Sequence, residues 1–167
     1  MRFPLISSLT LSLAVAGLPV LALAKDDAFA GIKEAAKAQA SNKMAEKFNL
    51  PSAAPAGAKV YIISPANDAT VTSPVTVVFG LSGMGIAPAG TQIEATGHHH
   101  LLIDDPTVDF ALPLPTSEQV VHFGKGQTET TLKLKPGKHT LQLVLGDWKH
   151  QAFNPTLASD KITITVK

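Results

Sequence analysis

Histidine is the residue type whose distribution in this sequence points most clearly to a chemical role. The first 97 residues contain none, and the densest group lies in Gly97–Asp105, which reads Gly-His-His-His-Leu-Leu-Ile-Asp-Asp. Imidazole is the commonest metal ligand among side chains and titrates near neutral pH. The chain's six histidines are His98, His99, His100, His122, His139 and His150. This distribution predicts that the region from Gly97 onward forms the functional site.

The three consecutive histidines open an apolar run that reads as a strand. Side chains alternate across a strand, so His98 and His100 share one face and His99 lies on the other. Two imidazoles on one face lie close enough to bind one metal ion. The same pattern is also typical of one hydrogen-bonded core histidine beside two solvated ones. The metal interpretation therefore depends on further imidazoles, His122 and His150, arriving from other parts of the chain.

The elements that would position these residues are short strands separated by turn residues. The predicted strands are 60–64, 75–81, 98–104, 119–123, 128–134, 139–145 and 161–166. Seven such strands with long loops predict an all-β fold, an antiparallel β-sandwich of immunoglobulin type. In that topology, the connections after the second, fourth and sixth strands lie at one end. These connections lead into His98, follow His122 and contain His150, so we expect the three imidazoles to meet there.

Three further residues are secondary candidates for the metal site: His99, Asp147 and Met84. Asp147, in Gly-Asp-Trp-Lys-His, could bind the metal or orient an imidazole by accepting its N–H. An equally good interpretation is that it caps the turn after the strand. Met84 lies in the loop before His98, where a thioether would suit Cu(I). Alternatively, it packs over the mouth of the sandwich.

The remaining polar residues of this region have simpler interpretations. His139 begins the sixth strand, where sandwich domains often carry a tyrosine that hydrogen-bonds across the corner, so we expect a structural role. Asp104 and Asp105 end the third strand far from its histidines, and two adjacent acids are a weak calcium signal. Lys125 and Trp148 flank the predicted cluster, and Trp148 would shield the site or contact a partner.

The N-terminal part of the chain is predicted to direct export. Residues 1–24 combine Arg2, an apolar run and Ala22-Leu23-Ala24, as in a cleaved signal peptide; an uncleaved anchor is the alternative. We therefore expect a periplasmic or secreted protein with no stable membrane insertion after cleavage. Residues 25–58 read as a spacer, with a helix over 26–48 and a Pro/Ala-rich linker, and residues 59–167 as the sandwich domain.

Composition excludes several classes of function. Arg2 is the only arginine and cysteine is absent. The lack of arginine argues against nucleic-acid binding and phosphate-clamping enzymes. The lack of cysteine excludes thiolate ligands and a blue-copper electron-transfer site. No serine lies in a Gly-x-Ser-x-Gly context, so a serine hydrolase is not supported and a binding protein is favoured over an enzyme.

Three motifs give the chain a resemblance to a known family. They are Gly-His-His-His-Leu-Leu-Ile-Asp from Gly97, His-Phe-Gly-Lys-Gly-Gln-Thr-Glu from His122, and Leu-Gly-Asp from Leu145 followed by His150 and Phe153. Over residues 59–167 the chain resembles an uncharacterised family of exported bacterial domains, some of which carry a misleading rod-shape label. The resemblance implies an exported single-domain protein and supplies no activity, so function must be argued from the site.

Two functions remain open on the sequence. The favoured one is a periplasmic metal-binding protein, for copper or alternatively zinc, with His98, His100, His122 and His150 as ligands. The alternative is an interaction module that contacts an envelope protein or a glycan through its loops and Trp148, with histidines tuning the response to pH. A metal-dependent oxidoreductase is the least favoured.

Overall fold

The structure is a computed structural model that describes residues 20–167. The described part of the chain falls into two units, with the division between Ala35 and Ala36. Within residues 20–167, one helix, α1, is followed by nine strands. The elements are α1 (Val20–Lys47), β1 (Lys59–Ser64), β2 (Thr70–Val71), β3 (Val75–Ser82), β4 (Gly85–Ile86), β5 (Thr96–Ile103), β6 (Val120–His122), β7 (Glu129–Leu132), β8 (Gly137–Gly146) and β9 (Ile162–Val166).

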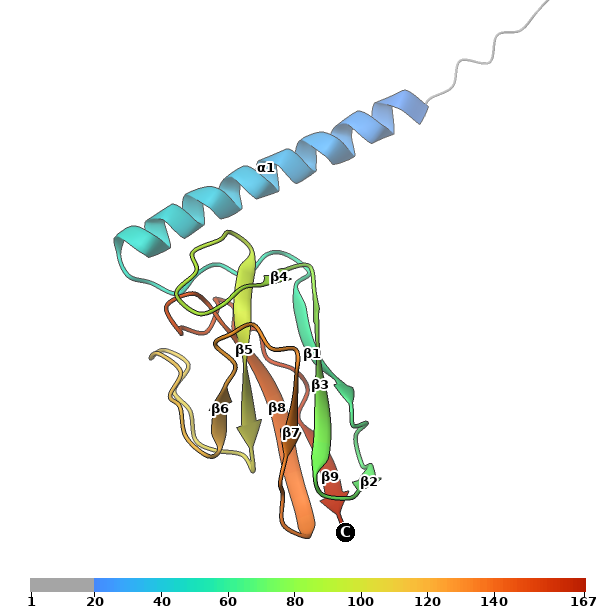
Figure 1. The fold of residues 1–167 in the computed structure, drawn as a ribbon. Coiled ribbons are helices and arrows are strands. Elements are labelled where there is room, and N and C mark those ends of the chain that lie inside the picture. Colours follow the sequence, from blue (N-terminus) through green and yellow to red (C-terminus); the bar gives the residue numbers. More distant parts are fainter. Residues whose placement is uncertain (1–19) are drawn as a thin grey trace, which may run out of the picture. The chain divides into compact units, whose positions relative to one another are not determined.

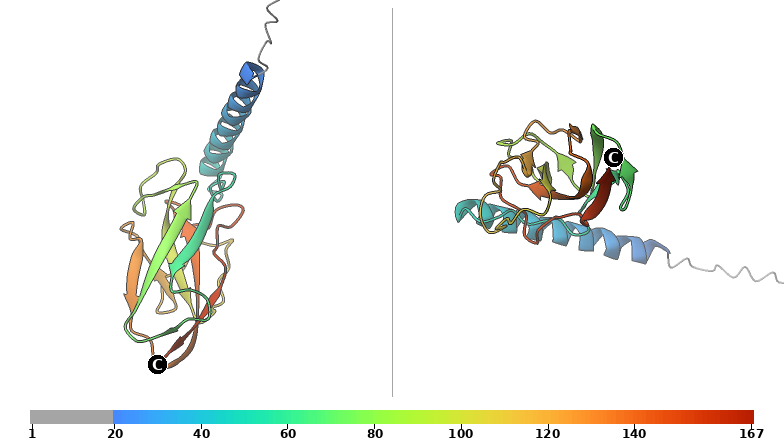
Figure 2. Two further views of the ribbon diagram at one scale, coloured as in Figure 1. Left: turned by 90° about the vertical axis from the view of Figure 1, so that its right-hand side faces the viewer. Right: turned by 90° about the horizontal axis from the view of Figure 1, so that it is seen from below.

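The strands form two sheets that pack face to face, so the all-β sandwich expected from the sequence is confirmed (Figures 1 and 2). One sheet has the order β1-β3-β7, and the other has the order β2-β9-β8-β5-β4, with β6 also paired to β5. All seven predicted strands are present. The two additional strands, β2 and β4, have two residues each, too short for an alternating pattern to reveal.

The main core lies between the two sheets and follows from side-chain alternation. Leu141, Leu143 and Leu145 of β8 are fully buried against β3 residues such as Val77 and Phe79. From β5, Leu101 and Ile103 enter the same core. The opposite face of β5, which carries His98 and His100, therefore points away from this core.

That outer face of β5 is also covered. A second apolar cluster joins Leu102 of β5 and Val144 of β8 to Leu114, with Phe110 packed against it. Residues 110–116 cross the outer face of the sheet, and Pro113 forms an isolated bridge with Gln151. Because β5 is covered on both faces, polar side chains on its outer face are removed from water.

The predicted helix over 26–48 is present as α1. In the second compact unit, Ala45 of α1 is buried and the Asn42 amide oxygen accepts a hydrogen bond from the backbone N–H of Ala53 at 3.1 Å. Asn49 ends the helix in a left-handed conformation, which asparagine tolerates well. Most of the predicted signal peptide lies outside the described residues. No helix of the described part is long and apolar enough to span a membrane.

Candidate metal centre

Strand β5 brings the first two imidazoles together. His98 and His100 alternate with His99, so both point to the outer face of the sheet, and both are fully buried. Their rings lie 5.0 Å apart between centroids, and their Nε2 atoms are separated by 3.2 Å. Two nitrogen ligands of a tetrahedral ion with bonds of about 2.0–2.1 Å lie about 3.3 Å apart. The observed separation therefore suits a shared metal ion as well as a hydrogen bond.

Strand β6 adds the third imidazole. His122 pairs with His100 across the antiparallel ladder, so the two side chains are direct neighbours on one face. The His122 ring stacks on His100 at 4.9 Å and meets His98 edge-on at 5.0 Å. One ligand nitrogen from each of the three histidines lies within 4.8 Å of the others. This triad could hold a metal ion.

The fourth imidazole comes from the loop after β8. The His150 ring lies 4.9 Å from His98, 4.7 Å from His122 and 6.2 Å from His100, all between centroids. His150 has a positive φ of 66°, an uncommon conformation for a non-glycine residue. Its carbonyl accepts a hydrogen bond from the N–H of Leu114 at 2.7 Å. All four histidines predicted as ligands are therefore brought together.

Two glycines make room for the imidazoles, and the sequence reading missed both. A Cβ on Gly146 would lie 3.0 Å from Nε2 of His100 and 3.4 Å from Nε2 of His98. A Cβ on Gly124 would overlap the ring of His122. The position of Gly146 could have been predicted from side-chain alternation. Gly146 follows Val144 by two residues and must share the outer face of β8 with it.

Burial favours the uncharged form of three of the imidazoles, those of His98, His100 and His122. Loss of hydration lowers the pKa of His98 to about 4, helped by His150 and His122 and opposed by the Asp147 carboxylate. Burial, with the neighbouring imidazoles, lowers the pKa of His100 to about 3. The pKa of His122 is lowered by burial and by His150. Neutral imidazoles keep the lone pairs that metal coordination needs.

Several imidazole nitrogens of the cluster lack a hydrogen-bond partner within the described part of the chain. They are buried Nδ1 of His98, Nδ1 of His100 and Nε2 of His122. A buried polar atom without a partner costs about 1–3 kcal/mol. Such a concentration of unsatisfied nitrogens in one place is typical of a site built to bind something.

The secondary candidates have other surroundings. His99 faces the inner core, where its ring packs 5.1 Å from Phe79 and its Nδ1–H donates to the Gln127 carbonyl at 3.4 Å. Met84 is half-buried and packs against that same inner core. The Asp147 carboxylate is buried, and its oxygens accept backbone and hydroxyl hydrogen bonds, as expected of a turn cap. None of the three joins the imidazoles of the outer face.

His139 lies at the opposite end of the sheet, as expected for a structural residue. It pairs with Asp104 at 3.0 Å, and its Nε2–H donates to the Lys135 carbonyl at 2.9 Å. Burial opposes the charge of His139, but the bonds to Lys135 and Asp104 outweigh it and raise the pKa. Asp105 pairs with Lys161. These acids thus tie strand ends together.

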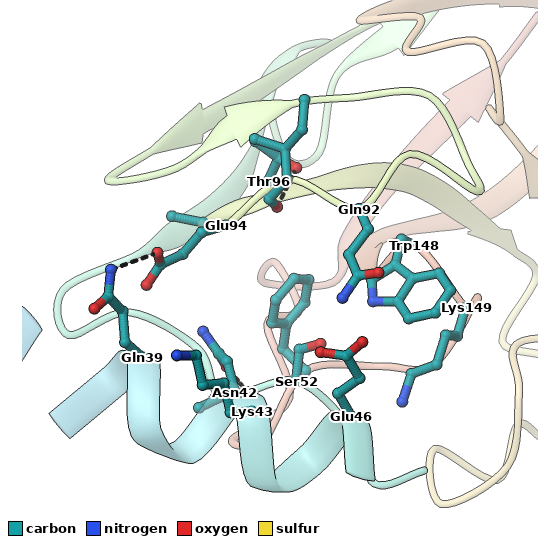
Figure 3. Close-up of a pocket in the computed structure, with 14 residues that line it drawn as sticks. Gln39, Asn42, Lys43, Glu46, Ser52, Gln92, Glu94, Thr96, Trp148 and Lys149 are labelled. Atoms are coloured by element: carbon teal, nitrogen blue, oxygen red, sulfur yellow. Dashed lines mark hydrogen bonds between the residues drawn. The ribbon is translucent and has the colours of Figure 1, made fainter. Parts of the chain in front are cut away.

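A separate cavity of about 310 Å³ lies beside the loop that carries His150 (Figure 3). Residues of α1, of the loop before β5 and of the loop after β8 line it. Trp148 and Lys149 form one wall, so Trp148 borders this cavity. Charged and amide side chains make up half of the remaining lining, including Glu46, Gln92 and Glu94.

Comparison with known families assigns the chain to one of them. Residues 77–167 match the family model described as "Domain of unknown function (DUF4399)", and the chain belongs to this family. The match includes all four clustered histidines and both glycines. Searches among curated proteins and among solved structures found no significant match. The family carries no established activity, so the geometry of the site must supply the function.

Proposed function

We propose that this chain is an exported protein that binds one copper ion, or alternatively zinc, through His98, His100 and His122, with His150 as a fourth ligand. The observation that supports the proposal most strongly is the convergence of three imidazoles within 4.8 Å of one another on a covered sheet face. Their lowered pKa values leave the lone pairs free at neutral pH. The export part of the proposal depends on the predicted signal sequence over residues 1–24.

Copper is preferred because of the chemistry of the donors. Imidazole suits both copper and zinc, and among divalent ions of the first row the affinity of such a site is highest for Cu²⁺. A thioether contribution from Met84 is not supported, because that side chain packs on the inner core. The proposed role is therefore binding and carriage of an ion by nitrogen ligands alone.

The proposal is tested by metal titration of the tag-free chain. We expect one equivalent of Cu²⁺ or Zn²⁺ to bind, with competition between the two giving the preferred ion. His98→Ala with His100→Ala should abolish binding, and His122→Ala should weaken it by more than the roughly 10–100-fold typical of losing an outer partner. His139→Ala, at the other end of the sheet, is the matched control and should bind normally. Absence of binding by the unaltered chain would overturn the proposal.

A second candidate, an interaction module, is favoured by the cavity beside Trp148. Its lining combines an aromatic wall with amide and charged groups, which suits a small polar ligand or a polar segment of an envelope partner. Envelope extract passed over the metal-free chain tests it. Capture of a ligand that is lost in Trp148→Ala but kept in His98→Ala would favour this function over metal binding.

A further inference from the structure

The loop that carries His150 is folded around one buried carboxylate. Asp147 is 1% exposed, and its Oδ1 accepts hydrogen bonds from the backbone N–H groups of Lys149 at 2.8 Å and Gln151 at 3.0 Å. These two residues flank His150 in the chain. The N–H of His150 also donates to the Asp147 carbonyl at 2.9 Å. The position of the fourth imidazole is therefore set by the position of this carboxylate.

The other carboxylate oxygen is held from the linker. Oδ2 of Asp147 accepts hydrogen bonds from the Ser52 hydroxyl at 2.8 Å and from the Ser52 N–H at 3.3 Å. Ser52 is fixed in turn, because its carbonyl accepts a hydrogen bond from the N–H of Asn154 at 2.9 Å. Lys149 ties the same loop to the linker through the Leu50 carbonyl at 2.7 Å. Figure 3 shows Ser52, from the linker, and Lys149, from the loop after β8, among the residues that line the cavity.

The four imidazoles differ in how they are supported. His98, His100 and His122 lie on strands whose ladder fixes their register. His150 lies on a loop, in a left-handed conformation that requires support from its surroundings. Loss of the Ser52 hydroxyl would remove the 2.8 Å hydrogen bond to Oδ2 of Asp147 and leave this oxygen only the longer bond from the Ser52 N–H at 3.3 Å. The loop would then shift, and the fourth imidazole with it.

We infer that Ser52 is a positioning residue that, through Asp147, holds His150 in place as the fourth ligand. The inference rests on the proposed metal binding. It assigns to the linker a part in the site, although Ser52 lies outside the matched family region 77–167. Without the Ser52 hydroxyl, His98, His100 and His122 would still bind the ion, with one fewer nitrogen ligand and lower affinity.

The test measures Cu²⁺ and Zn²⁺ affinity and counts imidazole ligands by X-ray absorption in the full tag-free chain. We expect Ser52→Ala to weaken binding by about 10–100-fold, as for other outer partners of metal ligands, and to lose one imidazole. Ser52→Thr, which keeps the hydroxyl, should restore most of both. Ser41→Ala, on an exposed position of α1, is the matched control.

A double variant separates positioning from general destabilisation. If Ser52 acts through His150, then Ser52→Ala combined with His150→Ala should bind no more weakly than His150→Ala alone. Unchanged affinity and ligand count in Ser52→Ala would overturn the inference while leaving metal binding in place. An additional loss on top of His150→Ala would also overturn it. Failure of the unaltered chain to bind either ion would overturn the proposed function, and the inference with it.

Discussion

At the scale of single residues, His98 and His100 are held uncharged by their surroundings. His98 and His100 are removed from water, and each lies beside other imidazoles whose protonation would repel a second charge. Their Nε2 atoms lie beside Gly146, where a Cβ would come within 3.0 Å of Nε2 of His100 and 3.4 Å of Nε2 of His98. Three kinds of residue therefore make the site: buried ligands, a glycine beneath them and a carboxylate that supports the loop.

Gly146→Ala tests the space beneath the ligands. The added methyl carbon would lie 3.0 Å from Nε2 of His100, a tight contact that requires the imidazole to move by a few tenths of an ångström. We expect the methyl group to hinder the bound ion more than the empty site, and an overpacking cost of about 1–3 kcal/mol borne by the metal-bound state lowers the affinity roughly 5- to 150-fold. Titration of the variant gives this loss, and thermal unfolding without metal shows whether the fold is kept. Gly31→Ala, where a Cβ meets no neighbour, is the control. Undiminished affinity in Gly146→Ala would show that ions do not bind over this glycine.

At the scale of elements, strand β5 divides its residues between two environments. Its inner face completes the core, and its outer face carries the imidazoles beneath the segment of Leu114. At the far end, His139 of β8 binds Asp104, which directly follows β5. One strand pair thus has a candidate binding site at one end and a structural tie at the other.

His139→Gln tests the structural tie. The raised pKa of His139 means that its stabilisation is complete below the ordinary value of 6.5 and is lost as pH rises through the folded value. Asp104 is partly exposed, so we expect a loss of only about 1 kcal/mol in acidic solution, shrinking in alkaline solution. Urea unfolding of the variant and of the unaltered chain in acidic and in alkaline solution measures this loss of stability. An equal loss at both, or an altered metal affinity, would contradict this role.

The sequence predicted the parts of the fold that depend on local pattern. Strand alternation placed His98 and His100 on one face, and strand order brought His122 and His150 to the same end. The cover over the outer face was missed, because its few apolar residues carry no strand period. The contact of Ser52 with Asp147 spans 95 residues and depends on tertiary packing alone, which no local pattern reveals.

At the scale of the whole molecule, the neutral imidazoles couple stability to pH. In the metal-free protein the pKa values of His98 and His100 are about 4 and about 3, against 6.5 in the unfolded chain. Below 6.5 the unfolded state binds protons that the folded state excludes. Acid therefore favours unfolding until the folded imidazoles themselves take up protons.

The free energy of unfolding of the metal-free chain should consequently fall as pH drops from 6.5 toward 4. Each of the two imidazoles contributes at most about 1.4 kcal/mol per pH unit. Urea unfolding at a series of pH values measures the slope. His100→Gln, which does not titrate, should show a shallower slope by about this amount. A variant slope as steep as that of the unaltered chain would contradict the burial of an uncharged His100.

The most direct test of the account is X-ray absorption on the tag-free chain loaded with one equivalent of Cu²⁺ or Zn²⁺. We expect an ion bound by three or four imidazole nitrogens at about 2.0–2.1 Å for zinc, with a similar imidazole shell for copper, and loss of this signal in His98→Ala with His100→Ala. A spectrum dominated by oxygen ligands, or one unchanged by the double substitution, would contradict it.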